Sequence, residues 1–147
     1  NNKLGSEFSK RYGAQSLIAS IDYKYINGSN KVFIENGLSQ ISTELEEYVS
    51  YVESCGIGEI YLNSMDNDGT GFGYDFETIG KIANSLGIPL IIAGGAGNSD
   101  HFKEALSINN VNAVATANLF NFIGNGLPLA RSNLFESGVN LANWKNE

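Results

Sequence analysis

The stretch Pro89-Leu-Ile-Ile-Ala-Gly-Gly-Ala-Gly97 decides the fold class of this chain. It starts as a short, continuous apolar run, which is typical of a parallel strand buried on both faces. It ends in a glycine-rich turn, and glycines let a ligand approach the backbone closely. Ser99 and Asp100 follow and are residue types that begin helices. The stretch therefore predicts a strand, a ligand-binding turn and a helix, in that order.

Three further apolar runs follow the same plan. The predicted strands cover Ser16–Ile21, Glu59–Asn63, Pro89–Ala93 and Asn112–Ala117. Amphipathic stretches with helical spacing separate and follow them, over Ser42–Ser54, Asp75–Leu86, Ser99–Leu106 and Leu129–Glu136. Between the first strand and the first of these helices, Tyr23–Ile26 and Lys31–Ile34 predict a small hairpin around Asn27-Gly28. Four strand–helix units in a row predict an α/β fold with a parallel sheet.

The length of the chain limits this sheet to half of a barrel. It has 147 residues, whereas a complete (β/α)8 or TIM barrel has about 250. We therefore expect residues 1–147 to form one (β/α)4 half-barrel, without a linker or second domain. Such a half has open edges, predicted at Leu17–Ile21 and Ala113–Ala117, and an uncovered apolar concave face. Both features predict that the isolated chain forms a homodimer.

Composition excludes several classes of partner. Sixteen acidic residues against nine basic ones leave a net charge of -7, which repels a phosphate backbone, so nucleic acid is not an expected partner. No apolar run is long enough to cross a membrane. No signal-like segment opens the chain, and the only cysteine, Cys55, can form no internal disulfide. These features predict a cytoplasmic protein that holds phosphate mainly through backbone N–H groups.

Polar residues follow the predicted strands, where the ligands of parallel α/β proteins bind. Asp22 comes directly after the first strand, and a partly desolvated carboxylate there can transfer protons. The alternative is a loop aspartate that accepts hydrogen bonds from neighbouring amides, which is the more common meaning of such a position. Gly94-Gly95 and Ala117-Asn118 end the third and fourth strands. If these are the last two strands of a barrel, their loops are its usual phosphate site.

Other sites have less support. Asp66-Asn-Asp68-Gly-Thr70 forms a turn, but it lacks the later glutamate of an EF-hand calcium loop. The glycine-rich turn lacks the Gly-x-Gly-x-x-Gly spacing of a dinucleotide-binding fold. His101 has no Cys or His companion, so no metal site is expected. Cys55 is interpreted as a small packing residue.

Taken together, these segments resemble the cyclase subunit of imidazole glycerol phosphate synthase. The resemblance covers the chain from Tyr12 to about Leu141 and matches strands five to eight of that barrel. Its segments are Ala19-Ser-Ile-Asp-Tyr-Lys24, Gly58-Glu-Ile-Tyr-Leu-Asn-Ser-Met-Asp-Asn-Asp-Gly-Thr70, Gly73-Tyr-Asp75, Pro89-Leu-Ile-Ile-Ala-Gly-Gly-Ala-Gly97 and Asn118-Leu-Phe-Asn-Phe122. The acidic Asp-x-Asp-Gly-Thr loop followed by Gly-Gly-Ala-Gly is its most specific combination.

The resemblance implies an activity in histidine biosynthesis. The family closes an imidazole ring on a phosphoribulosyl-formimino aminoimidazole carboxamide ribonucleotide, with ammonia from a glutaminase subunit and no redox cofactor or metal. Asp22 matches one of two catalytic aspartates, and the other belongs to strand one of the family's barrel. The 147-residue piece alone is therefore expected to be inactive.

The resemblance also implies binding residues, and it leaves alternatives open. Glu59 matches a charged residue at the ammonia entrance. Asn63 stands where the family usually has threonine, and Asn118 where it has serine; both positions are expected to face the ligand. The residues matched to the glycerol-phosphate side of the ligand are Asp68, Gly69, Gly94, Gly95, Ala117 and Asn118. The departures leave open a paralogue that supports acetamidino-group formation on surface sugars, or a non-catalytic half-barrel that only binds phosphate.

Overall fold

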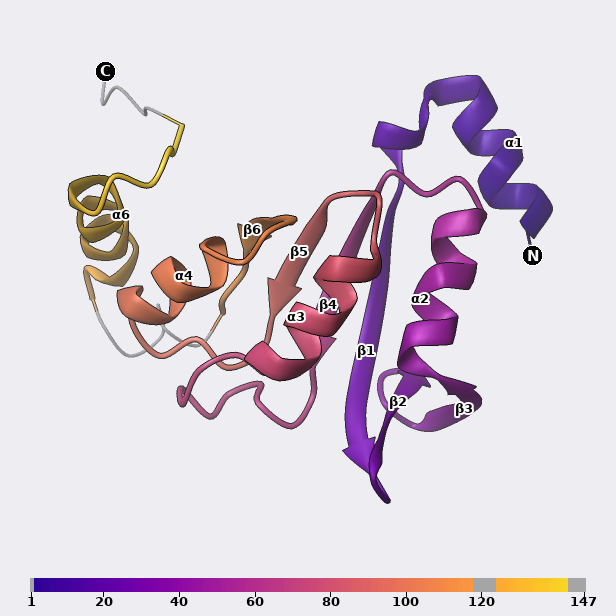
Figure 1. Ribbon diagram of the computed structural model, residues 1–147, viewed down its shortest axis with the longest axis horizontal. Helices are drawn as coiled ribbons and strands as arrows, with labels where there is room; N and C mark the ends of the chain where they lie inside the picture. Colours follow the sequence, from indigo (N-terminus) through magenta and orange to yellow (C-terminus); the bar gives the residue numbers. More distant parts are fainter. Residues whose placement is uncertain (1, 118–123, 143–147) are drawn as a thin grey trace.

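The computed structural model describes residues 2–117 and 124–142 (Figure 1). Two helical segments precede the sheet: α1 (Asn2–Tyr12) and a 3-10 turn (Ala14–Ser16). The strands are β1 (Ile18–Ile26), β2 (Ser29–Ile34), β3 (Ser39–Glu44), β4 (Glu59–Ser64), β5 (Leu90–Ala93) and β6 (Val111–Val114). The remaining helices are α2 (Leu45–Ser54), α3 (Phe76–Ser85), α4 (Ser99–Leu106) and α6 (Gly126–Glu136).

The strands form one six-stranded sheet in the order β3-β2-β1-β4-β5-β6. The neighbours β1, β4, β5 and β6 are parallel, whereas β2 and β3 extend the sheet as antiparallel strands beyond β1. A helix follows each parallel strand in the chain: α2, α3, α4 and α6. The predicted run of strand–helix units is therefore confirmed, in an α/β arrangement consistent with part of a TIM barrel.

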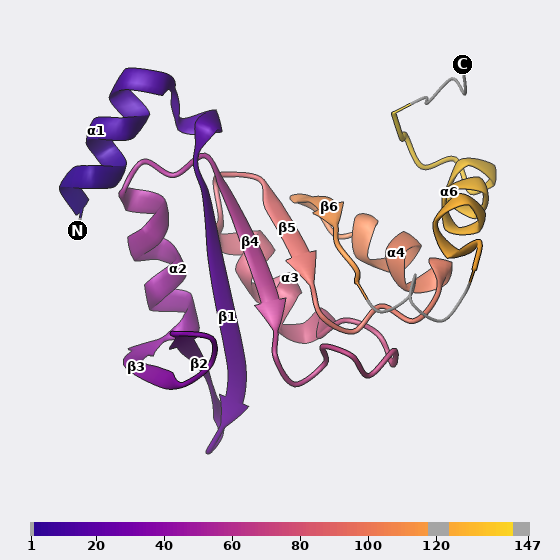
Figure 2. The same ribbon diagram turned by 180° about the vertical axis from the view of Figure 1, so that it is seen from behind.

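Helices α2 and α3 cover only one face of the sheet, as the two opposite views in Figures 1 and 2 show. Alternate residues of the parallel strands face this helical layer because side chains of a strand point to its two faces in turn. These inward residues form the core together with Val49, Ile79 and Ile82 from the helices. The large buried residues of β1, β4 and β5 are Ile21, Tyr23, Ile60, Leu62, Leu90 and Ile92.

The opposite face of the sheet differs from the sequence-based expectation. An apolar concave face was predicted, but most of the bulky apolar residues face the helices instead. The open face of β1 carries Ile18, Ser20 and Asp22, and that of β4 carries Glu59, Tyr61 and Asn63. The open face is therefore mixed: polar and small residues share it with Ile18, Tyr61 and Ile91.

The strand β1 is longer than predicted. It runs through Asp22 without a break, because Ile18–Tyr23 pair with β4 while Asp22–Ile26 pair with β2. Asp22 therefore lies within a strand and not directly after it. The predicted hairpin is present, but its first strand is the second half of β1.

The strand β3, the helix α1 and the 3-10 turn were not predicted. Ser39–Glu44 has a polar sequence and forms a strand because it pairs with β2. As a result, the helix predicted from Ser42 begins at Leu45, and neither Ser42 nor Thr43 caps it. The helix α4 begins at Ser99 as predicted. Its N-cap is Asn98, whose side chain accepts a hydrogen bond from the backbone N–H of His101.

One predicted sheet edge is correct and the other is only partly so. The strand β6 ends the described sheet on one side. On the other side β2 and β3 lie beyond β1, so the sheet ends at β3. Only Ile18–Ile21 lack a partner on the β2 side of β1 among the described residues.

The helix α3 is tied to β1 through Asp75. Its carboxylate accepts hydrogen bonds from Thr78 N, as an N-cap, and from the Tyr23 hydroxyl, both at 3.1 Å. Burial raises the pKa of Tyr23, and the charge of Asp75 raises it further. The phenol therefore remains a hydrogen-bond donor and fixes the start of α3 beside the carboxyl end of the sheet.

Replacing Ile92 by alanine should destabilise the protein strongly. Ile92 is fully buried between the sheet and its helices, so Ile92→Ala leaves a cavity and should cost about 2–5 kcal/mol in the free energy of unfolding. The matched control is Ile18→Ala, because Ile18 is 56% exposed on the same sheet; it should change stability by less than about 0.5 kcal/mol. Urea denaturation measures both, and equal losses would contradict the assignment of the core to the helical face.

Candidate functional site

The parallel register brings polar residues into one row at the carboxyl end of the sheet. Asp22 pairs with Asn63, and Asn63 pairs with Ala93. All three point to the open face. The Asn63 amide Nδ2 donates a hydrogen bond of 3.0 Å to Asp22 Oδ1. One oxygen of Asp22 is thereby oriented by a neutral donor.

The loop after β4 is held in shape by Asn67. The Asn67 side chain donates to Gly73 O at 2.9 Å, and Thr70 returns two hydrogen bonds to Asn67 O. The same loop is anchored to the β1–β2 hairpin because Asp66 accepts from Tyr25 N at 2.8 Å. Asp68 and Gly69 are therefore presented on an ordered turn above the end of β5.

The glycine-rich turn after β5 packs directly against that loop. The Gly73 N–H donates to Gly95 O at 2.8 Å. A Cβ at Gly95 would lie 2.0 Å from Gly73 O, and one at Gly97 would lie 1.9 Å from Gly71 O. Both positions therefore require glycine because the two loops pack closely here. From the sequence alone, these glycines had been attributed to the close approach of a ligand. A side chain at Gly95 would disturb this packing as well as any ligand.

Two backbone donors of this turn remain unused. Gly95 and Ala96 are buried, and within the described residues their N–H groups make no hydrogen bond. Buried N–H groups almost always have a partner. The turn is followed after two residues by the N-terminus of α4, which carries a partial positive charge. Backbone donors beside a helix N-terminus are the arrangement that holds anions in proteins.

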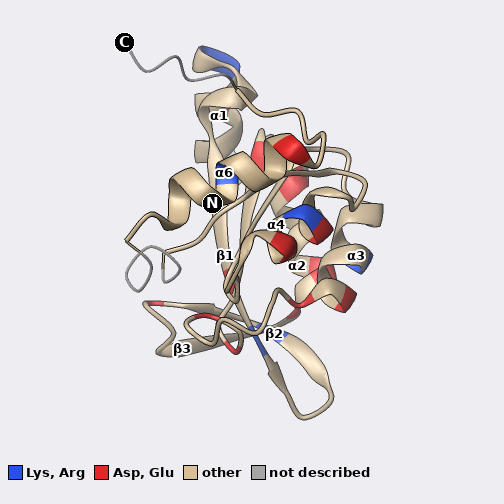
Figure 3. Cartoon of the chain, turned by 90° about the vertical axis from the view of Figure 1, so that its left-hand side faces the viewer, with Lys and Arg blue, Asp and Glu red and all other residues tan. Residues whose placement is uncertain are grey.

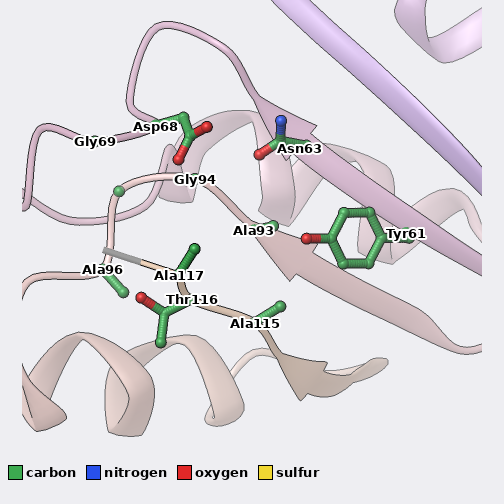
Figure 4. Close-up of a pocket in the computed structure, with 11 residues that line it drawn as sticks. Tyr61, Asn63, Asp68, Gly69, Ala93, Gly94, Ala96, Ala115, Thr116 and Ala117 are labelled. Atoms are coloured by element: carbon green, nitrogen blue, oxygen red, sulfur yellow. The ribbon is translucent and has the colours of Figure 1, made fainter. Parts of the chain in front are cut away.

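A pocket of about 170 Å³ lies between these loops (Figure 4). It is lined by Tyr61, Asn63, Asp68, Gly69, Ala93, Gly94, Gly95, Ala96, Ala115, Thr116 and Ala117. The structure thus brings together six residues singled out from the sequence: Asn63, Asp68, Gly69, Gly94, Gly95 and Ala117. Asn118 lies outside the described residues.

The other two predicted residues do not line the pocket. Asp22 is joined to the pocket through its hydrogen bond with Asn63. Glu59 begins β4 on the same face as Asn63, four residues earlier, which is about 13 Å along a strand. It is therefore at the opposite end of the strands, and β4 connects the two positions.

None of the described residues that line the pocket has a basic side chain. Acidic positions also outnumber basic ones over the chain (Figure 3). Outside the pocket lining, Lys24 Nζ lies 3.9 Å from Asp66 Oδ1, and both side chains are partly exposed. An anion in this pocket would be bound by backbone dipoles rather than by cationic side chains.

His101 has a structural role in this region. Its Nδ1 accepts a hydrogen bond of 3.1 Å from Gly97 N, and its backbone N donates to Asn98 Oδ1 at 3.0 Å. It thereby joins the glycine-rich turn to the start of α4. Among the described residues, no group of three or more His, Cys, Asp or Glu side chains could hold a metal ion. Within the same ranges, no helix is both long and apolar enough to cross a membrane.

Besides the lining alanines Ala93, Ala96 and Ala115, three contributors were missed by sequence reasoning. Tyr61 and Thr116 line the pocket, and Asn67 shapes its upper loop. Tyr61 has a sequence signal, since it shares the two-residue period of Glu59 and Asn63 on β4. Asn67 has none, because its partner Gly73 is fixed only by the folded loop.

Comparisons with known proteins agree with this geometry. A family model described as "Histidine biosynthesis protein" matches residues 1–124. The chain is 43% identical over 142 residues to "Putative imidazole glycerol phosphate synthase subunit hisF2" of Parasynechococcus marenigrum, covering 96% of this chain and 53% of that protein.

Two further relatives are each named imidazole glycerol phosphate synthase subunit HisF. The chain is 37% identical over 136 residues to the one from Chloroherpeton thalassium, covering 92% of this chain and 54% of the relative. It is 37% identical over 139 residues to the one from Sulfurisphaera tokodaii, covering 95% and 55%. The chain therefore spans about half the length of the curated relatives it matches. With most of its residues matched by the family model, this chain belongs to the histidine biosynthesis protein family.

Proposed function

We propose that residues 1–147 form the second half of a (β/α)8 barrel that acts as the cyclase of imidazole glycerol phosphate synthase. The observation that carries this proposal is the row formed by Asp22 and Asn63 beside the pocket of Gly94, Gly95 and Ala117. It combines a proton-transfer group with backbone anion donors at the carboxyl end of one parallel sheet. The names of the relatives favour this function over a role in surface-sugar biosynthesis.

In this mechanism the pocket holds one phosphate of a phosphorylated substrate. Its oxygens accept hydrogen bonds from the N–H groups of Gly95 and Ala96, near the N-terminus of α4. Asp68 is exposed at the rim and, being anionic, suits substrate hydroxyl groups rather than phosphate oxygens. Gly69 and Asn118 are proposed to complete the site on the two sides. No redox cofactor or metal takes part in this proposal.

Asp22 would then serve as general acid or base. The Asn63 amide orients one carboxylate oxygen at 3.0 Å, so the other oxygen can exchange a proton with the substrate. A second carboxylate is proposed to come from strand one of the complete barrel. If the protein lacks that partner, the alternative is a half-barrel that binds phosphate without turnover.

The nitrogen source is proposed to be ammonia from a glutaminase subunit. Glu59 supports this because it lies at the amino end of β4, on the same face as Tyr61 and Asn63. A path along this face would connect the amino end of the sheet with Asp22. A cytoplasmic location fits this role and stays a prediction.

Self-association of the 147-residue chain also stays a prediction. It is favoured by the unpaired outer edge of Ile18–Ile21 and by the exposed side chain of Ile18. The mixed polarity of the open sheet face weakens the apolar driving force that was expected from the sequence.

Placing a negative charge at Ala117 should prevent phosphate binding. Ala117 is exposed and lines the pocket, so Ala117→Asp sets a carboxylate against the anion without the loop clash expected at Gly95. The dissociation constant for inorganic phosphate, measured by calorimetry, should rise about tenfold or more, which corresponds to about 1.4 kcal/mol. Ala117→Asn has nearly the same shape without the charge and is the control. Equal affinities of the two variants would argue against an anion site here.

Removing the acid of Asp22 should stop turnover but not binding. In the complete barrel, Asp22→Asn keeps the shape of the side chain and removes its proton transfer, so the cyclase rate with an ammonium salt should fall by about 10²–10⁴-fold. Inorganic phosphate should still bind with unchanged affinity. Glu46→Gln, on the exposed side of α2, is the control for a lost carboxylate. Full turnover of Asp22→Asn would show that Asp22 is only structural.

Changing Glu59 should affect turnover with glutamine but not turnover with an ammonium salt. In the complex with a glutaminase, Glu59→Gln should lower turnover driven by glutamine and leave turnover driven by an ammonium salt near normal. The reason is that Glu59 is remote from the pocket and would act only on ammonia that enters at the amino end of β4. Glu47→Gln, exposed on α2, is the control. Equal loss with both nitrogen sources would contradict a role at the entrance.

A further inference from the structure

Among the described residues that line the pocket, Tyr61 is the only aromatic one. It pairs with Ser20 on one side and Ile91 on the other, in the row directly below Asp22, Asn63 and Ala93. The other lining residues are small or carry short polar side chains. Tyr61 therefore forms the floor of the pocket, and its size sets how deeply a ligand can enter.

The hydroxyl of Tyr61 differs from those of the two buried tyrosines. The Tyr23 hydroxyl donates to Asp75 and the Tyr74 hydroxyl donates to Ala115 O, each at 3.1 Å. The Tyr61 hydroxyl makes no hydrogen bond with any residue in the ranges that the structure describes. Figure 4 shows it directed toward Ala93 and the pocket. A partly buried phenol normally finds a polar partner, and here the open position lies in the pocket.

The phenol keeps its proton at neutral pH. Burial raises the pKa of Tyr61, and the nearby charges of Asp68 and Asp22 raise it further. A higher pKa means that the protonated form persists to higher pH, so the group presents an O–H donor. A ligand would accept this hydrogen bond with an oxygen atom, such as that of a sugar hydroxyl or a carbonyl.

We propose that Tyr61 is a specificity-determining residue, whose hydroxyl donates a hydrogen bond to the organic part of a phosphorylated ligand held at the Gly94-Gly95 turn. This assignment rests on the proposed phosphate site. Tyr61 is level with Ile91, three residues before Gly94, and this separation is about 10 Å along a strand. A phosphate on the N–H groups of Gly95 and Ala96 occupies the turn end of the pocket, so the end lined by Tyr61 is left for the organic part of the ligand.

The test compares two probes on three proteins. Calorimetry measures the binding of inorganic phosphate and of ribose 5-phosphate to the unmodified protein, to Tyr61→Phe and to Tyr25→Phe. Tyr61→Phe retains the ring and removes only the hydroxyl. Tyr25→Phe makes the same change on a side chain that is 62% exposed, on β1 and outside the pocket lining.

We expect Tyr61→Phe to bind ribose 5-phosphate about 3- to 10-fold more weakly, as the loss of one neutral hydrogen bond predicts. Its affinity for inorganic phosphate should not change, which also shows that the pocket is intact. Tyr25→Phe should bind both probes normally.

Two results with the variant would overturn the assignment while leaving the phosphate site in place. One is unchanged affinity for ribose 5-phosphate in Tyr61→Phe. The other is an equal loss for both probes, which would mean that Tyr61 shapes the turn and does not contact the organic part. If the unmodified protein binds neither probe, the phosphate site itself is refuted, and the role of Tyr61 with it.

Discussion

The parallel register of β1, β4 and β5 is the constraint on which the rest of this structure depends. It sets Asp22 beside Asn63 and Asn63 beside Ala93, so that three chain segments far apart in sequence end in one row. A shift of one residue would turn each of these side chains to the other face of the sheet, because the side-chain period of a strand is two. The apolar residues that alternate with them prevent such a shift: Ile21, Ile60, Leu62 and Ile92 are buried against the helices. The hydrophobic core thus fixes the position of the polar row.

Close packing between two loops completes the site above that row. The glycine-rich turn after β5 and the loop after β4 approach so closely that neither Gly95 nor Gly97 has space for a side chain. The Gly73–Gly95 hydrogen bond and the side chain of Asn67 join the two loops. The outcome is a small pocket with backbone donors inside and no cationic side chain on its described walls. Such a pocket suits a phosphate in a protein with a net charge of -7, because the dipoles that bind the anion are supplied by the main chain.

The same sheet face connects three different chemical groups along β4. Glu59, Tyr61 and Asn63 follow one another at two-residue intervals, from the amino end of the strand to its carboxyl end. A carboxylate, a phenol and an amide are thereby aligned below a single pocket. This alignment explains why one strand contributes to every part of the proposed function: nitrogen entry, ligand selection and orientation of Asp22.

The sequence by itself determined the fold class and which strand ends carry the candidate site residues. Apolar runs that end in Asp22, Asn63, Gly94-Gly95 and Ala117 predicted parallel strand–helix units with their polar residues at one edge, and the structure gathers most of these residues there. Local signals were sufficient because strand hydrophobicity and turn glycines depend on near neighbours in the chain.

Only the tertiary structure decided which residues meet. The polar segment Ser39–Glu44 becomes a strand because β2 offers it a hydrogen-bonding edge. Tyr61 becomes the floor of a pocket because the register aligns it with Ile91, and Gly95 is required by contact with Gly73. Each of these depends on partners that are distant in sequence, and such partners are set by packing and strand register rather than by local propensity.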